Sequence, residues 1–136
     1  SAALACLNVL GTAFSEPPLK VYLKNQEGDE YIDKHPAAIL LENPNPNMTA
    51  SLMNNYIVTS VAVSGDAFLL KLRNESGAVI QLIPLLPEMV EVKGNTEQLI
   101  TKYEYKQKGN TMTILPEDMI HLRERITGED FLLLDQ

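Results

Sequence analysis

The chain has 136 residues, with a hydrophobic fraction of 45% and a charged fraction of 21%, ordinary values for one globular domain. Its formal charge is −7. Because nucleic-acid binding needs a surplus of Lys and Arg, such binding is not expected. No run reaches the ~18 apolar residues that span a bilayer. The single cysteine, Cys6, excludes a disulfide within the chain and argues against an all-cysteine zinc site.

The first segment carries a helical pattern. Apolar side chains recur at spacings of three and four at Ala3, Leu7, Leu10 and Phe14. This predicts a helix over residues 2–15, which Pro17 and Pro18 end. Because few polar residues interrupt its circumference, we expect the helix to be buried on most sides. Cys6 could act as a nucleophile there, but core packing is the favoured role, since burial makes a thiol inert.

Turn and cap residues organise the next fifty positions. Residues 19–24 alternate as a strand, and the turn at 25–29 predicts a short hairpin with residues 31–32. Pro36 suits the first turn of a helix. Thr49 is the expected N-cap of a second long helix, which Gly65 ends. A rigid connector is predicted between these two helical segments, because proline fixes φ and lacks a backbone N–H donor. Its residues are Asn43, Pro44, Asn45, Pro46 and Asn47.

The pattern changes to a period of two beyond Gly65. Strand candidates cover residues 68–73, 79–83, 89–92, 99–106 and 112–115, and a turn at 116–118 leads into 119–123. Gly- and Asn-containing turns separate three of the pairs, which predicts an antiparallel meander. Pro84 and Pro87 are expected to fix the crossing between strands.

The predicted fold class is therefore α+β, with two helices packed on a largely antiparallel β-meander. We expect a single domain over residues 1–136, helical over about 1–65 and β-rich over about 66–125.

His121 is the main candidate for chemistry, since Glu117, Asp118 and Glu124 lie within a few positions of it. A metal site needs three or four ligands that face one point, and the other histidine, His35, is far away in the chain. A structural role for His121, at the edge of a strand with solvated neighbours, is therefore favoured. No catalytic, cofactor or metal site is predicted.

Lysines and tyrosines alternate along one predicted strand, at Lys102, Tyr103, Tyr105, Lys106 and Lys108. Such interleaving can serve a nucleic-acid surface. A half-buried strand explains it equally directly, with the lysines on one face and the tyrosines on the other, and is the favoured interpretation.

The order of several short signals resembles the portal proteins of lambda-like tailed phages. The matching segments are His35-Pro36, Leu40-Leu41, Asn43–Pro46, Met48-Thr49, Gly65-Asp66-Ala67-Phe68, Ser76-Gly77, Leu82–Pro87 and Asp118–Arg123. Their order and spacing cover residues 1 to about 125. The sequence departs from the family after Arg125, where a Gly-rich stretch and a Ser-Pro-Leu signal are expected.

The resemblance implies the peripheral wing domain of a portal, with stem, clip and crown lying downstream and absent here. It also implies a dodecameric ring at one capsid vertex, in virions assembled in the bacterial host cytoplasm. The implied partners are other copies of the subunit, the terminase packaging motor, the capsid protein and the head–tail connector. DNA would pass through the channel without specific binding. Neither a membrane, a cofactor nor an enzymatic activity is implied.

Two other hypotheses remain open. One is a free-standing module that binds a protein or peptide at a sheet edge. The other is a small hydrolase that uses His121, for which no nucleophile is evident. The sequence begins with Ser1 and not with an initiator methionine, and the apolar run at 131–134 lies close to the last residue. Both features predict a chain trimmed from a longer protein.

Overall fold

The computed structural model describes residues 1–15, 17–95 and 99–123. The helices are α1 (Ala2–Ser15), α2 (Pro36–Glu42) and α3 (Ala50–Ser64). The strands are β1 (Tyr22–Asn25), β2 (Gly28–Tyr31), β3 (Asp66–Arg73), β4 (Val79–Leu85), β5 (Val90–Lys93), β6 (Lys102–Gln107), β7 (Asn110–Ile114) and β8 (Met119–Arg123). Short 3-10 turns, Pro87–Met89 and Pro116–Asp118, precede β5 and β8.

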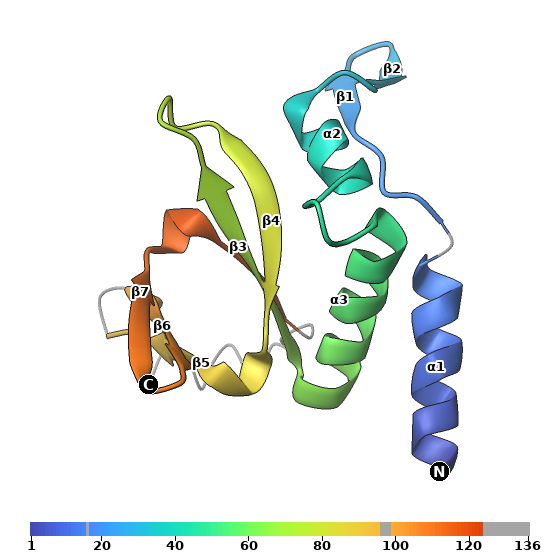
Figure 1. Cartoon of the computed structure of the whole chain (residues 1–136). Coiled ribbons are helices and arrows are strands. Elements are labelled where there is room, and N and C mark those ends of the chain that lie inside the picture. The colour runs from blue at the N-terminus through green and yellow to red at the C-terminus, as the bar shows by residue number, and fades with distance from the viewer. Residues whose placement is uncertain (16, 96–98, 124–136) are drawn as a thin grey trace.

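All strand pairs among the described residues are antiparallel, in a β1–β2 hairpin and two sheets ordered β4-β3-β8 and β5-β6-β7. The predicted α+β class is confirmed (Figure 1). The helix that the sequence indicated at Pro36 is α2, which adds to the two helices of the predicted fold class. It starts at Pro36, where His35 Nδ1 accepts a hydrogen bond from the N–H of Ala37.

The strand order differs from a continuous meander at two points. Strand β4 does not pair with β5, and β8 returns to pair with β3, which lies far earlier in the chain. A 3-10 turn that begins at a proline stands at each of these points, Pro87 and Pro116. Each turn redirects the chain from one sheet to the other, so the two sheets are interleaved in sequence.

Two apolar clusters cover the two faces of β3. On one face Phe68 packs with residues of β4, β6, β7 and β8, namely Leu85, Tyr103, Ile114 and Met119. On the other face Leu69 packs with Leu82 and with Met53 of α3. Successive strand residues point to opposite faces, so the β4-β3-β8 sheet is a central layer with the second sheet on one side and α3 on the other.

Helix α3 is held at both ends and in the middle. Thr49 Oγ1 accepts the N–H of Leu52 at 3.2 Å, and Gly65 has φ 79°, the left-handed conformation that ends a helix. Midway, the Tyr56 hydroxyl donates to the carbonyl of Leu85 and accepts the N–H of Phe68 at 3.4 Å. These contacts attach α3 directly to the strand ends at β3 and β4.

Helix α1 packs chiefly against α3, on the side away from the sheet (Figure 1). The helices approach closely at Gly11, where an added Cβ would lie 2.5 Å from Asn55 Nδ2. The expectation that α1 is buried on most sides is wrong: Val9 is 69% exposed, and Cys6 is exposed rather than packed in the core. The reason is that α3 covers only one side of an almost wholly apolar helix.

We expect Gly11→Val to weaken the docking of α1 by displacing the side-chain amide of Asn55, at a cost of about 1 kcal/mol in the free energy of unfolding. Ala13→Val is the matched control, because it adds a β-branched side chain at an exposed position of the same helix. Urea unfolding and protease cleavage within α1 measure the difference. Equal effects from both variants would contradict close packing at Gly11.

Candidate interaction surfaces

The connector between α2 and α3 is bonded to the edge of the central sheet. The carbonyl of Pro44, which is buried, accepts the N–H of Leu82 at 2.8 Å. The side-chain amide of Asn45 donates to the carbonyl of Leu82 at 2.9 Å, and its oxygen accepts the N–H of Asn47 at 3.0 Å. The connector therefore pairs both the backbone N–H and the carbonyl of Leu82 on edge strand β4. Asn43 and Pro46 are exposed.

The two prolines predicted at the strand crossing lie in different settings. Pro84 is inside β4, opposite Leu69, and not between strands. Because β4 is an edge strand, the missing N–H of a proline can be tolerated there. Pro87 begins the 3-10 turn that leads to β5 in the other sheet, so it does stand at a crossing.

We expect Asn45→Ala to lower the free energy of unfolding by about 1 kcal/mol, because the carbonyl of Leu82 loses its amide donor. Asn47→Ala is the control, since that side chain is exposed and its residue contributes a backbone N–H only. Chemical denaturation of the two variants measures their free energies of unfolding. A larger loss of stability in Asn47→Ala than in Asn45→Ala would contradict a stabilising bond from the Asn45 amide to Leu82.

His121 lies in a partly buried cluster that joins the two sheets. Its side chain is 6% exposed, and Nε2 lies 2.7 Å from Asp66 Oδ1. Nδ1 lies 3.2 Å from the Tyr103 hydroxyl, and the ring stacks on Phe68 at 4.4 Å between centroids. An ionised Asp66 accepts hydrogen bonds only, so Nε2 carries the proton and Nδ1 accepts from Tyr103.

The partners of His121 differ from the neighbouring carboxylates that the sequence raised as an alternative. The carboxylate of Asp118 pairs with Arg73 at 2.8 Å, and the carboxylate that His121 contacts is that of Asp66. Glu124 lies outside the described residues. Asp66 lies 55 positions earlier in the chain than His121. Only the pairing of β3 with β8 brings it close, and no local spacing in the sequence signals that pairing. His121 lies on β8, an edge strand of the central sheet, and the nearby Glu117 is exposed, although the His121 side chain itself is mostly covered.

Burial lowers the pKa of His121, while the Asp66 carboxylate raises it and Arg123 lowers it further. Burial also raises the pKa of Tyr103, so its hydroxyl keeps the proton that it donates to Nδ1. The cluster thus holds a neutral imidazole between a carboxylate and a hydroxyl. Among the described residues no group of three His, Cys, Asp or Glu side chains could hold a metal ion.

We expect stability to fall as the pH drops below about 6.5, the ordinary pKa of histidine. Because the folded pKa of His121 is lowered, the unfolded chain binds the proton more readily, and the stabilisation present above pH 6.5 is lost on acidification through the lowered pKa. Urea unfolding between pH 5 and pH 8 measures this slope. His121→Gln should flatten it, and an unchanged slope in that variant would assign the effect to other groups.

The lysines of β6 and β5 are paired with glutamates. Lys106 and Lys93 lie 2.8 Å and 2.6 Å from the two carboxylate oxygens of Glu91. The hydrogen bonds from these two lysines lower the pKa of the Glu91 carboxyl to about 2. Lys102 lies 3.3 Å from Glu104. Tyr103 is buried on the other face, so the half-buried strand interpretation is confirmed. The positive charges on this face are largely matched by negative ones, which disfavours a phosphate-binding surface.

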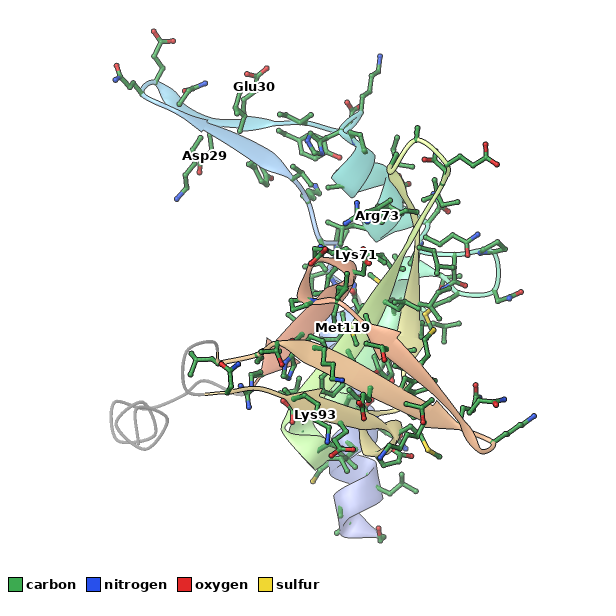
Figure 2. The ribbon with its side chains drawn as sticks, turned by 90° about the vertical axis from the view of Figure 1, so that its left-hand side faces the viewer. Asp29, Glu30, Lys71, Arg73, Lys93 and Met119 are labelled. Atoms are coloured by element: carbon green, nitrogen blue, oxygen red, sulfur yellow. The ribbon has the colours of Figure 1, made fainter. Side chains whose placement is uncertain are left out.

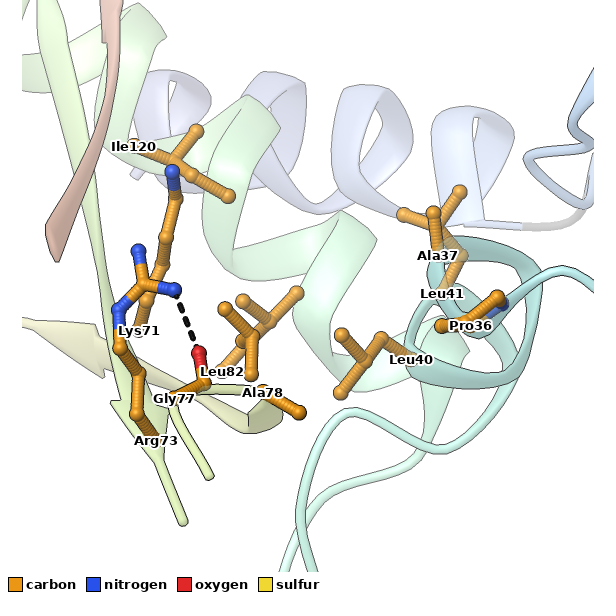
Figure 3. Close-up of a pocket in the computed structure, with 11 residues that line it drawn as sticks. Pro36, Ala37, Leu40, Leu41, Lys71, Arg73, Gly77, Ala78, Leu82 and Ile120 are labelled. Atoms are coloured by element: carbon orange, nitrogen blue, oxygen red, sulfur yellow. Dashed lines mark hydrogen bonds between the residues drawn. The ribbon is translucent and has the colours of Figure 1, made fainter. Parts of the chain in front are cut away.

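An open groove of about 480 Å³ lies between α2 and the central sheet (Figure 3). Its apolar lining comprises Pro36, Ala37, Leu40, Leu41, Ala78, Val79, Leu82 and Ile120. Lys71 and Arg73 flank it, and Arg73 donates to the carbonyl of Gly77 at 2.9 Å. We call this feature the α2 groove.

Two further elements expose apolar side chains. The outer face of α1, defined here by Ala5, Cys6, Val9 and Leu10, is exposed and carries no charge. The β1–β2 hairpin is exposed along both strands and projects from the body, with Asp29 and Glu30 far from the sheets (Figure 2). No helix among the described residues is long and apolar enough to cross a membrane.

Comparison with known proteins gives one family. Residues 1–132 match the family described as "Phage portal protein". The portal protein of Enterobacteria phage HK97 is 27% identical over 121 residues, which is 87% of this chain and 28% of that protein. The chain therefore spans less than a third of the length of this curated relative.

Solved structures show the same fold. A chain from the "Neck of empty GTA particle computed with C6 symmetry" gives a TM-score of 0.78 at 17% identity, over 93% of this chain and 34% of that one. The crystal structure of an HK97 family phage portal protein from Corynebacterium diphtheriae gives a TM-score of 0.60 at 14% identity, over 98% of this chain and 41% of that one. Here too the matched region is a minority of the longer chain.

Proposed function

This chain belongs to the phage portal protein family, and we propose on that premise that it is a structural part of a portal ring at the capsid vertex of a tailed phage. The observation that carries the proposal is the match along residues 1–132. The shared fold with a chain of a gene-transfer-agent neck supports it. The role is mechanical: a rigid, layered domain occupies the outer part of each subunit and offers surface to its neighbours.

The coverage supports a domain assignment. The chain matches 28% of the HK97 portal protein, so we propose that residues 1–136 are one wing-type domain and that stem, clip and crown belong to other parts of the subunit. The described residues form one stack of layers, in which β3 contacts both cores. A single domain with an α-rich and a β-rich half accounts for this arrangement.

The proposed partners are those of a portal: further copies in a dodecameric ring, the terminase packaging motor, the capsid protein and the head–tail connector. DNA passes through the channel without specific binding. The charge of −7 and the pairing of Lys93, Lys102 and Lys106 with glutamates support a domain that does not hold DNA. The proposed site of action is the virion, after assembly in the bacterial host cytoplasm.

The residues selected from the sequence have structural roles in this proposal. Asn43, Pro44, Asn45 and Pro46 set the connector that fastens α2 and α3 to the sheet. Gly65 ends α3 so that β3 can start at once, and Pro87 sends the chain to the second sheet. Pro84 occupies an edge strand and contributes stiffness.

We propose no enzymatic role. A hydrolase would need a nucleophile beside His121, and the ring nitrogens contact Asp66 and Tyr103 instead. The phenol of Tyr103 has a raised pKa, which opposes its use as a nucleophile near neutral pH. The cluster therefore serves to hold the two sheets together.

We expect residues 1–136 alone to be a monomer or a small, concentration-dependent oligomer, and the whole subunit to assemble into a ring. A stable contact buries upwards of ~1,000 Å² in total, and a wing without its stem offers only part of this. Light scattering coupled to size exclusion measures both species, and negative-stain microscopy shows the ring. A whole subunit that stays monomeric would contradict the proposed function, and a dilution-resistant dodecamer of residues 1–136 would contradict the need for the other parts.

A further inference from the structure

The two sheets are joined by few covalent and polar links. In the described part of the chain the backbone passes between them twice, through the 3-10 turns that begin at Pro87 and Pro116 (Figure 1). Among the described residues, one side-chain hydrogen bond joins a strand of one sheet to a strand of the other, and it lies between Tyr103 on β6 and His121 on β8. The remaining link is the apolar core around Phe68.

Each of the two crossings is anchored to the central layer. Before the first crossing, the Tyr56 hydroxyl of α3 donates a hydrogen bond to the carbonyl of Leu85 at the end of β4. At the second crossing, Arg73 of β3 pairs with Asp118 at 2.8 Å. Neither anchor includes a histidine. The face of the second sheet between the crossings is therefore held to the central sheet by the apolar core and by the hydrogen bond from β6 to β8.

The hydrogen bond between Tyr103 and His121 depends on a neutral imidazole. Nδ1 lies 3.2 Å from the phenol oxygen and accepts its hydrogen, while Nε2 donates to Asp66 at 2.7 Å. In an imidazolium both ring nitrogens are donors. The hydroxyl then has to turn its own hydrogen away from Nδ1, and Tyr103 as a whole is 4% exposed, so little of it can reach water. A donor left without an acceptor in a site withdrawn from water is costly.

We propose that Asp66, His121 and Tyr103 form a pH-sensitive latch between the two sheets. With a neutral His121 the latch is closed, and β6 is fastened to β8. On acidification Nδ1 takes up one proton from the solvent, the phenol keeps its own proton, and the second sheet opens from the central layer more often. The inference concerns the fold of this domain and does not depend on the portal role.

The groups that face the imidazole set the pH at which the latch opens. Asp66 of β3 accepts from Nε2, and Arg123 of β8 lies 3.5 Å from the same carboxylate oxygen. Tyr103 faces the ring from β6, and the uncharged ring of Phe68 stacks on it. Burial lowers the pKa of the imidazole, the Asp66 carboxylate raises it, and Arg123 lowers it further. The latch is therefore closed above about pH 6.5, the ordinary pKa, and is lost as the pH falls through the lowered one.

Hydrogen–deuterium exchange of the whole subunit tests the latch, with labelling times scaled for the intrinsic effect of pH on exchange. We expect the amides of β6 and β7 to exchange about tenfold faster at pH 5 than at pH 8. Low concentrations of urea separate this local opening from complete unfolding, because an opening that exposes little surface responds weakly to urea. The exchange of β6 and β7 should respond weakly, and that of α3 strongly. Identical rates and urea responses for these three elements at pH 5, or no acceleration of β6 and β7, would overturn the proposal.

Variants assign the pH dependence to one histidine. His121→Gln keeps an amide that can donate to Asp66 but takes up no proton. The ratio of exchange rates between pH 5 and pH 8 in β6 and β7 should then fall to about one. His35→Gln is the matched control, because it removes the other histidine of the chain, which caps α2, and it should keep the full ratio. A full ratio in His121→Gln, or a lost one in His35→Gln, would contradict the latch.

Two further variants decide the question if His121→Gln weakens the whole fold. Tyr103→Phe removes the hydroxyl, so the latch is already open at pH 8; the exchange of β6 should be faster there, and the ratio between pH 5 and pH 8 smaller. Asp66→Asn removes the carboxylate that raises the pKa of His121, so the midpoint of the acceleration should move to lower pH. A fixed midpoint in Asp66→Asn, or an unchanged ratio in Tyr103→Phe, would assign the pH dependence to groups outside the latch and refute it.

Discussion

Strand β3 is covered on both faces, and the positions of the other layers follow from this constraint. Phe68 and Leu69 are neighbours in the chain but belong to different cores, one between the two sheets and one beneath α3. A shift of one residue in its pairing would exchange these side chains between the two cores. The register with β4 and β8 is therefore fixed by both cores at once.

Polar contacts at the margins of β3 reinforce this arrangement. Asp66 reaches His121, which is bonded in turn to Tyr103 of the other sheet, while the hydroxyl of Tyr56 bonds the backbone of Phe68 from α3. Polar groups that are partly withdrawn from water are costly when unpaired, so each of these contacts favours one relative placement of the layers.

The packed centre of the fold around β3 contrasts with its more exposed periphery. Helix α1 packs chiefly against α3, the β1–β2 hairpin is exposed along both strands, and the α2 groove is open. A hairpin of two strands is marginally stable by itself in water. Exposed apolar side chains occur in α1 and the hairpin, such as Val9 and Tyr22, and also on the sheets, such as Ile80 and Met112.

The sequence alone determined the local features. Turn chemistry placed the breaks between strands, Thr49 and Gly65 bounded α3, and the alternation in β6 placed Tyr103 inside, because each of these depends on residues a few positions apart. The portal resemblance was also available from the order of short motifs.

The tertiary structure alone decided which distant segments meet: β8 pairing with β3, Asp66 joining His121, and the connector bonding Leu82. It also decided that Cys6 and Val9 are exposed. Hydrophobicity shows that a side chain favours cover, but only the packed arrangement shows whether its own chain supplies that cover.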